Sequence, residues 1–355
     1  MSSQVNEPLI RDIVQEVLGR LGRSAPSAAG KTTPPPAAPS PACDRPGPAP
    51  TPASRPGRYG VFGDANEACA AAHAAYRQLS EKGVAGRNTV VRIIKEICCA
   101  KSKEWGRLEL EETKIGRLDH KIEKLEGLRA VPGVEFLQPY GLSGDHGITL
   151  EECAPFGVIG AVTPSTHSIP TVACNIISMV AAGNSVVFNA HPGAAKCALA
   201  AVRVFNEAIH RELGIENLAC LIDPPTLDSF QALAKNEHVK LLCVTGGPGV
   251  VKAAMASGKR AVCAGPGNPP VLVDGTSCIE RAARQVILGA AYDNNVLCIG
   301  EKEVFVLDRV FDAFLAALEK SGACRLSSAQ VERLTQAAFT FPPGQGGGCA
   351  EPVVN

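Results

Sequence analysis

Apolar runs alternate with helical patterns over residues 157–264, and this alternation constrains the fold more than any other feature of the chain. Strands are expected at 157–163, 185–189, 218–222, 239–244 and 260–264. Helices are expected between them, at about 171–182, 193–211, 226–235 and 249–257. Strands that are apolar throughout and followed by helices indicate parallel βαβ units with both sheet faces covered. The expected fold class is α/β, with ligands bound outside the carboxyl ends of the strands.

Helices are expected before this region and a second α/β pattern after it. Residues 66–79, 88–103 and 118–128 have helical spacing, and 133–152 reads as the short extended pieces of a β-ribbon. Downstream, strands at 271–274 and 304–307 and helices at 277–291 and 310–320 begin a second core. The expected domains are 59–262, with a ribbon at about 133–154, and 263–355.

The first 58 residues divide into a short helix and a linker. Apolar residues recur at helical spacing over 6–21, which predicts an amphipathic helix within a segment 1–22. Residues 23–58 are dominated by Pro, Ala and Ser, a composition that cannot bury enough apolar surface to fold. The helix is therefore expected to act as a docking peptide, the alternative being an ordinary helix packed on the domain.

The overall composition favours a small-molecule partner. The 355 residues carry 35 basic and 35 acidic side chains, which gives no electrostatic argument for a nucleic-acid or membrane partner. The 14 cysteines are scattered, without a CxxC pair or a signal peptide before them. A reducing cytosol is expected, with no metal site and with most thiols in the core.

Cys298 is the strongest candidate for a reacting group. It follows an amide-rich segment that includes Asn294 and Asn295. A cysteine acts as a nucleophile when it has thiolate character, which a helix N-terminus and these amide donors are expected to supply. A thiol of this kind, in a chain that also carries a glycine turn of dinucleotide type, indicates covalent capture of a carbonyl followed by hydride transfer.

Three loops after strands offer groups for a ligand. The loop 163–170 supplies hydroxyls and free N–H groups, and its His167 is either a direct participant or an ordinary loop histidine. The glycine turn 245–249 can let the backbone approach a pyrophosphate, or is a plain strand-helix turn. The segment 265–270 joins the two α/β regions, where clefts form.

Three segments, 157–194, 241–270 and 293–304, resemble the aldehyde dehydrogenase superfamily and occur in the family's order. The resemblance covers about 62–303 and is greatest to the CoA-acylating aldehyde dehydrogenases of bacterial microcompartments. It implies a Rossmann-type NAD-binding domain over 59–262 and a catalytic domain over 263–355. The helix at 1–22 also resembles the encapsulation peptide that directs such enzymes into the microcompartment lumen in the bacterial cytoplasm.

The resemblance also implies a reaction and its residues. Cys298 would attack propionaldehyde or acetaldehyde, NAD would take the hydride, and CoA would accept the acyl group from the Cys298 thioester. His167 stands where close relatives carry Asn, so stabilisation of the oxyanion would fall to His167 or to backbone N–H groups. The implied cofactor-binding residues are Thr163, Pro164 and Ser165 beside the nicotinamide, His191 and Pro192 near the adenosine, Thr245, Gly246 and Gly247 at the pyrophosphate, and Gly265.

Two alternatives remain open. Hydrolytic relatives place a water-activating glutamate near the positions of Ala264 and Gly265, and the absence of an acid there favours transfer to CoA over hydrolysis. A hydrolytic dehydrogenase is therefore the weaker enzyme reading. The family body continues beyond Asn355, which implies a truncated, poorly soluble chain that forms the homo-oligomer only at full length. In that case a catalytically incomplete, shell-docking fragment is the alternative. The aldehyde's length and the choice between NAD and NADP stay open.

Overall fold

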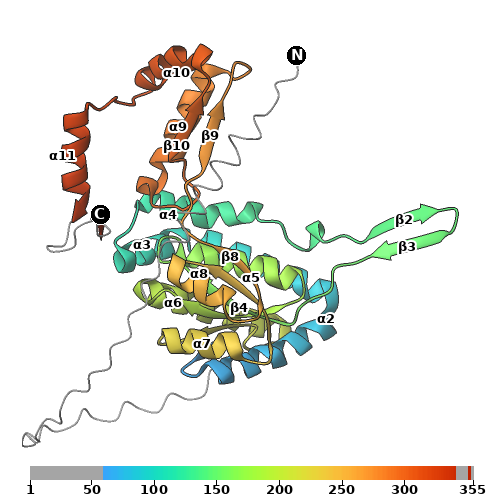
Figure 1. Ribbon diagram of the computed structural model, residues 1–355. Helices are drawn as coiled ribbons and strands as arrows, with labels where there is room; N and C mark the ends of the chain where they lie inside the picture. The colour runs from blue at the N-terminus through green and yellow to red at the C-terminus, as the bar shows by residue number, and fades with distance from the viewer. Residues whose placement is uncertain (1–58, 341–350, 353–355) are drawn as a thin grey trace, which may run out of the picture. The chain divides into compact units, whose positions relative to one another are not determined.

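A six-stranded parallel sheet forms the centre of the computed structural model, which describes residues 59–340 and 351–352 (Figure 1). The strand order is β1-β6-β5-β4-β7-β8 and every neighbouring pair is parallel. The strands are β1 (Val61–Phe62), β4 (Val158–Thr163), β5 (Ser185–Ala190), β6 (Ala219–Ile222), β7 (Val239–Thr245) and β8 (Arg260–Ala264). The chain runs from β4 outward through β5 and β6, then returns to the other side of β4 with β7. This reversal creates a ligand crevice at the carboxyl ends of β4 and β7.

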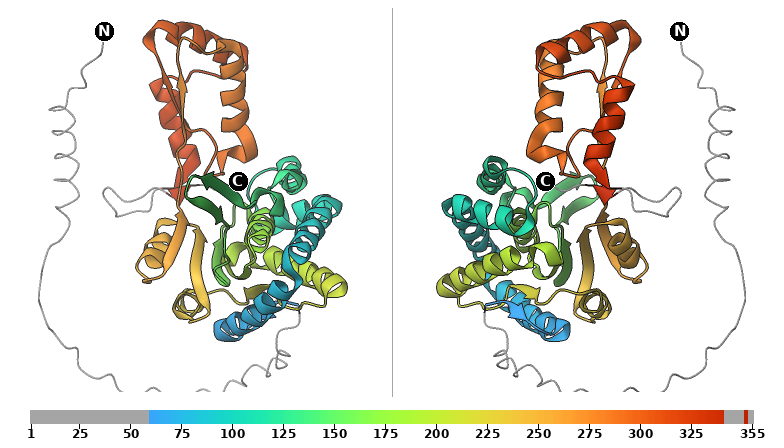
Figure 2. Two further views of the ribbon diagram at one scale, coloured as in Figure 1. Left: turned by 90° about the vertical axis from the view of Figure 1, so that its right-hand side faces the viewer. Right: turned by 90° about the vertical axis from the view of Figure 1, so that its left-hand side faces the viewer.

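Helices cover both faces of this sheet, as the apolar strands predict (Figure 2). All six residues of β4 are buried, and their side chains alternate between two cores. Ile159 and Ala161 belong to the core on the side of α5 (Ser168–Ala181) and α6 (Ala195–Leu213). Val158 and Val162 belong to the core on the side of α7 (Leu227–Lys235) and α8 (Pro248–Met255). The predicted α/β class with a parallel sheet is confirmed.

The amino-terminal helices differ in detail from the expectation. The structure has one element, α2 (Ala65–Ala100), interrupted by the non-helical Gly83, where two separate helices were expected. A further helix, α3 (Ser102–Thr113), was not predicted because its sequence is mostly polar, although it buries Trp105 and Glu109. The chain continues through α4 (Leu118–Glu126) and the short turns η1 (Gly127–Ala130) and η2 (Val134–Phe136).

An antiparallel ribbon extends from the helices toward the right of Figure 1. Its strands are β2 (Tyr140–Gly144) and β3 (Gly147–Glu151), paired from Tyr140 opposite Glu151 to Gly144 opposite Gly147. Both strands are exposed along their whole length.

The second α/β region is built on a parallel pair of strands, β9 (Pro270–Val273) and β10 (Glu303–Val306). Between them lie α9 (Ile279–Ala291) and η4 (Tyr292–Asn295), and α10 (Asp308–Lys320) follows β10. The core here is small, with Val273, Ala283 and Phe314 buried. The remaining elements are α11 (Ser328–Ala338), β11 (Phe339–Thr340) and β12 (Glu351–Pro352).

The predicted helix at 1–22 and linker at 23–58 lie outside the described residues. Within the described part of the chain, no helix is both long and apolar enough to cross a membrane. No group of three or more His, Cys, Asp or Glu side chains there is arranged to hold a metal ion.

Candidate active site

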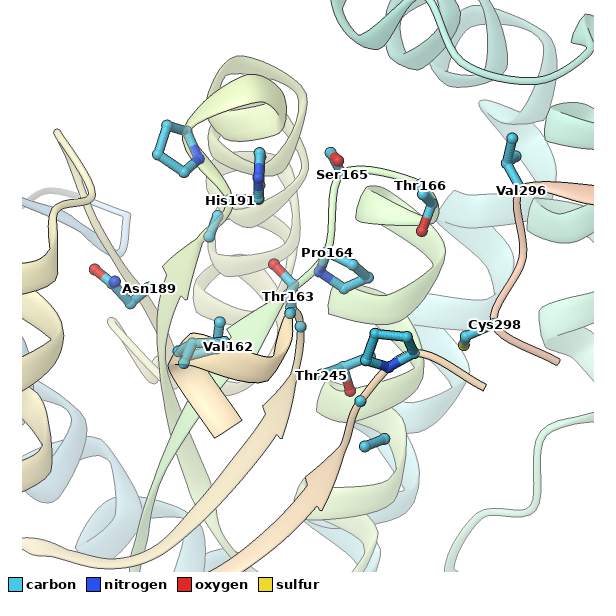
Figure 3. Close-up of a pocket in the computed structure, with 18 of the residues that line it drawn as sticks. Val162, Thr163, Pro164, Ser165, Thr166, Asn189, His191, Thr245, Val296 and Cys298 are labelled. Carbon is cyan, nitrogen blue, oxygen red and sulfur yellow. The ribbon is translucent and has the colours of Figure 1, made fainter. Parts of the chain in front are cut away.

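A cavity of about 590 Å³ opens at the carboxyl ends of the central strands. Its walls come from the loops after β4, β5, β7 and β8 and from the segment around Cys298. In Figure 3, His191 and Cys298 lie at opposite ends of this wall, with Thr163 and Pro164 between them. The lining includes Cys298 and every predicted cofactor-side residue, namely Thr163, Pro164, Ser165, His191, Pro192, Thr245, Gly246, Gly247 and Gly265.

The glycine turn places a helix N-terminus at the cavity. Gly247 is the N-cap of α8, and Pro248 occupies the first turn, where its missing N–H is not needed. A Cβ atom on Gly246 would lie 2.7 Å from the Cγ1 atom of Val250, so a side chain there would collide with the helix. The free N–H groups of this first turn suit a phosphate, because they carry the positive end of the helix dipole.

His191 is held in place by its own backbone and by its neighbours. Its N–H donates to the Thr163 carbonyl oxygen at 3.0 Å, which ties the ends of β4 and β5 together. Its Nδ1 accepts the Gly193 N–H at 3.1 Å and so caps η3 (Pro192–Ala194). The Nδ1 atom is therefore an acceptor, which leaves Nε2 as the N–H donor of the neutral ring.

The described residues of the cavity wall include no carboxylates. Among the described residues that line it there is no Asp or Glu, and Lys302 is the one side chain with a fixed positive charge. The Lys302 Nζ donates to the carbonyl oxygens of Leu297 at 2.8 Å and Gly300 at 2.9 Å, so this charge braces the turn that carries Cys298. The described part of the wall therefore offers no acid that could activate a water molecule.

Cys298 is exposed to the cavity on the connection between η4 and β10. No helix begins at Cys298, because the next regular element along the chain is the strand β10, so this stretch of chain supplies no helix N-terminus to the thiol. The Asn295 amide does not serve the thiol either, since its Nδ2 donates to the carbonyl oxygens of Ala290 at 2.6 Å and Glu301 at 3.0 Å. Asn295 instead closes the loop from α9 to β10.

Gly267 packs directly against the Cys298 backbone. A Cβ atom at Gly267 would lie 2.1 Å from the Cys298 carbonyl oxygen, which no rearrangement of a flexible side chain could relieve. Sequence reasoning did not single out Gly267 or Lys302. Gly267 lies inside the segment 265–270 and Lys302 inside the segment 293–304, which the sequence did identify, but nothing distinguished either residue from its neighbours there.

His167 does not line the cavity, although the adjoining residues 163–166 do. It is the N-cap residue of α5, and its Nδ1 is buried without a hydrogen-bond partner. Burial lowers the pKa of His167 to about 3, with help from the positive charges of Lys124 and Lys121. The ring is therefore neutral at pH 7 and lies outside the cavity lining.

Replacing His167 with asparagine should make the free energy of unfolding fall less steeply as the pH is lowered below 6.5. The folded pKa of about 3 lies below the unfolded value near 6.5, so acid protonates the unfolded chain first and favours unfolding. His167 should therefore lower the free energy of unfolding by at most about 1.4 kcal/mol per pH unit as pH falls below 6.5. Urea denaturation at pH 7.5 and 5.5 measures how much free energy of unfolding each protein loses between the two pH values. Equal losses in the unaltered chain and in the His167→Asn variant would contradict this prediction.

The comparisons with known proteins agree with this geometry. A model of the aldehyde dehydrogenase family matches residues 62–324, most of the described chain. The chain belongs to the aldehyde dehydrogenase family. Its α/β fold matches that of solved propionaldehyde dehydrogenases.

Several relatives of this aldehyde dehydrogenase are CoA-acylating enzymes. The acetylating acetaldehyde dehydrogenase EutE of Salmonella typhimurium is 43% identical over 285 residues, which are 80% of this chain and 61% of the relative. A Rhodopseudomonas palustris propionaldehyde dehydrogenase, solved with bound CoA and an acylated cysteine, is 38% identical with a TM-score of 0.74. That match covers 79% of this chain and 65% of the solved one.

A third relative comes from a microcompartment. The propionaldehyde dehydrogenase of the Clostridium phytofermentans fucose utilisation bacterial microcompartment is 41% identical, with a TM-score of 0.74. The match covers 79% of this chain and 65% of that structure. The chain thus spans a little less than two thirds of the length of these relatives.

Proposed function

We propose that this aldehyde dehydrogenase oxidises a short aldehyde, propionaldehyde or acetaldehyde, and transfers the acyl group to CoA. The observation that carries the proposal is an exposed Cys298 facing a cavity that contains a helix N-terminus and, among the described residues, no carboxylate. Relatives described as acetylating acetaldehyde dehydrogenase and CoA-propanoylating propanal dehydrogenase support this choice of substrates.

The residues on the sheet side of the cavity fit a dinucleotide. The N-terminus of α8 and Gly246, where a Cβ would collide with Val250, suit a pyrophosphate. His191 and Pro192 would face the adenosine, and Thr163 to Ser165 would hold the nicotinamide near Cys298. When bound there, NAD would supply the acceptor for the hydride.

Cys298 would carry the covalent steps. Its thiolate adds to the aldehyde carbon, and the new C–S bond gives a thiohemiacetal whose oxygen takes the negative charge. Backbone N–H groups of the turn that carries Cys298 would donate to this oxygen and stabilise its charge. Loss of the hydride leaves a thioester, and attack by the CoA thiolate restores the Cys298 thiolate. No carboxylate among the described lining residues would direct water at the thioester.

A pre-steady-state assay tests this proposal. The purified chain is mixed with NAD and propionaldehyde, or in parallel acetaldehyde, and NADH absorbance is followed before and after CoA is added. A burst of about one NADH per chain, becoming steady turnover on addition of CoA, is expected because the acyl group waits on Cys298. Steady turnover without CoA would indicate hydrolysis, and the absence of both a burst and acylated Cys298 by mass spectrometry would overturn the proposal.

We further propose that residues 1–22 direct the enzyme into the lumen of a bacterial microcompartment. The support is their amphipathic pattern and the microcompartment origin of a solved relative. In the same assay a chain lacking 1–22 serves as the control. It should keep its burst but lose cosedimentation with isolated shells, and retained cosedimentation would contradict the docking role.

A further inference from the structure

The loop that carries Cys298 begins with an unusual backbone. Asp293, Asn294 and Asn295 have φ values of 48°, 57° and 58°, so three successive residues other than glycine lie in the left-handed region. Asp and Asn tolerate this region best, but a run of three is not a conformation that the loop would keep by itself. Such strain persists only where surrounding structure holds the backbone in place.

Asp293 provides that hold through a buried carboxylate. Its side chain is inaccessible to solvent, and that of its partner Lys124 is only 4% exposed. One carboxylate oxygen, Oδ1, accepts the Arg117 N–H at 2.8 Å, and the other, Oδ2, pairs with the Lys124 Nζ. A Cβ at Gly116 would lie 2.1 Å from Oδ1, so only glycine leaves room for this contact.

The backbone of the loop is gripped at the same place. The Asp293 N–H donates to the Nδ1 of His120 at 2.8 Å. The ring of the preceding Tyr292 stacks on the His120 ring, with centroids 4.2 Å apart and planes 14° apart. Residues 116–124, which form the turn before α4 and most of α4 itself, therefore hold both the side chain and the main chain of this loop.

None of this grip touches the cavity. Asp293, Lys124 and His120 are absent from its described lining, whereas residues 295–298 form part of its wall. The far end of the loop rests against Gly267, as described above. The Cys298 segment is thus held at Asp293 by residues outside the cavity, and at Cys298 by the close backbone contact with Gly267.

We propose that Asp293 is a positioning residue that fixes the Cys298 loop in its left-handed conformation and so places the thiol in the cavity. The proposal rests on the proposed function in one respect, namely that Cys298 is the reacting group. Asp293 acts through the loop and not on the substrate. A buried ion pair is costly to assemble and very costly to break, so the loop changes position only when Asp293 leaves Lys124.

The variants separate position from folding. Asp293→Asn keeps a residue that tolerates positive φ and can accept the Arg117 N–H, but it loses the ion pair with Lys124. Since this variant leaves Lys124 buried without a counterion, the double variant Asp293→Asn/Lys124→Met removes that charge as well. Glu301→Gln, which changes an acid on the other side of Cys298, is the matched control.

Hydrogen exchange and the NADH burst are the two measurements. Exchange in peptides spanning 293–300 should accelerate about tenfold in both Asp293 variants, while peptides of β4 and α5 stay within about twofold. The burst rate should fall by about tenfold to a hundredfold, because the Cys298 thiol would be misplaced relative to the aldehyde. The affinity for NAD should stay within about twofold, because the residues that bind it are unchanged. A merely structural role would instead raise exchange throughout the sheet and weaken NAD binding.

The outcomes distinguish the two proposals. Unchanged exchange over 293–300, or an acceleration shared equally by β4, overturns the positioning role, as does an unchanged burst rate. Absence of a burst in the unaltered chain counts against the proposed function alone, and the exchange data then still decide whether Asp293 fixes the loop.

Discussion

Replacing Cys298 with alanine should remove the NADH burst and the acylated protein together. Without the thiolate no C–S bond forms, so no hydride donor is generated in the cavity. The loss should be at least about a thousandfold, as is typical when a covalent nucleophile is removed. The burst assay with propionaldehyde measures it, with intact-protein mass spectrometry to detect the acyl group.

The chain offers matched controls for this substitution. Cys278 and Cys324 are also exposed cysteines of the carboxyl-terminal region, but neither lines the cavity. Their alanine variants should keep the full burst. NADH formation that survives in Cys298→Ala at the rate of the unaltered chain would mean that another group captures the aldehyde.

Replacing Lys121 with methionine should destabilise the protein by about 3–5 kcal/mol, the cost of leaving one partner of a buried ion pair without the other. The side chains of Lys121 and Glu109 are each 1% exposed, and the Lys121 Nζ lies 2.9 Å from the Glu109 Oε1. Glu109 also accepts the N–H groups of Ser168 and Ile169 at the start of α5. Its uncompensated charge would therefore disturb the loop that faces the cavity.

Denaturant titration monitored by circular dichroism measures this loss. Arg92→Ala, which breaks exposed ion pairs with Glu96 and Glu212, should cost less than about 1 kcal/mol. In a double-mutant cycle, Glu109→Gln and Lys121→Met should be coupled by at least about 1 kcal/mol, because the second change removes the charge that the first leaves unpaired. Additive losses would show that the two groups do not interact strongly in the folded protein.

The sheet and much of the cavity could be predicted because their signals are local. The run of β4 is apolar on both faces, and the structure buries all six of its residues. The glycine turn at Thr245 follows a strand and opens a helix, which fixes it at the ligand edge. Each signal lies within a few neighbouring residues, so a periodicity argument can find it.

The supports of the site could not be predicted because they join distant residues. Glu109, Lys121, Lys124 and Asp293 are charged, and charged side chains are read as exposed unless a partner is known. The partner of Asp293 lies 169 residues earlier, at Lys124. The left-handed backbone at 293–295 likewise leaves no periodic signal, so the conformation of the Cys298 loop could not be predicted.

The long separation between Lys124 and Asp293 also sets an order of events during synthesis. At about 5–20 residues per second, the ribosome needs on the order of ten to thirty seconds to add the residues between them. Throughout this interval the nascent chain contains residues 116–124 but not Asp293, the acid that they bind in the folded protein. The Cys298 thiol is made after the last strand of the central sheet, and it gains its final position only once Asp293 has paired with Lys124.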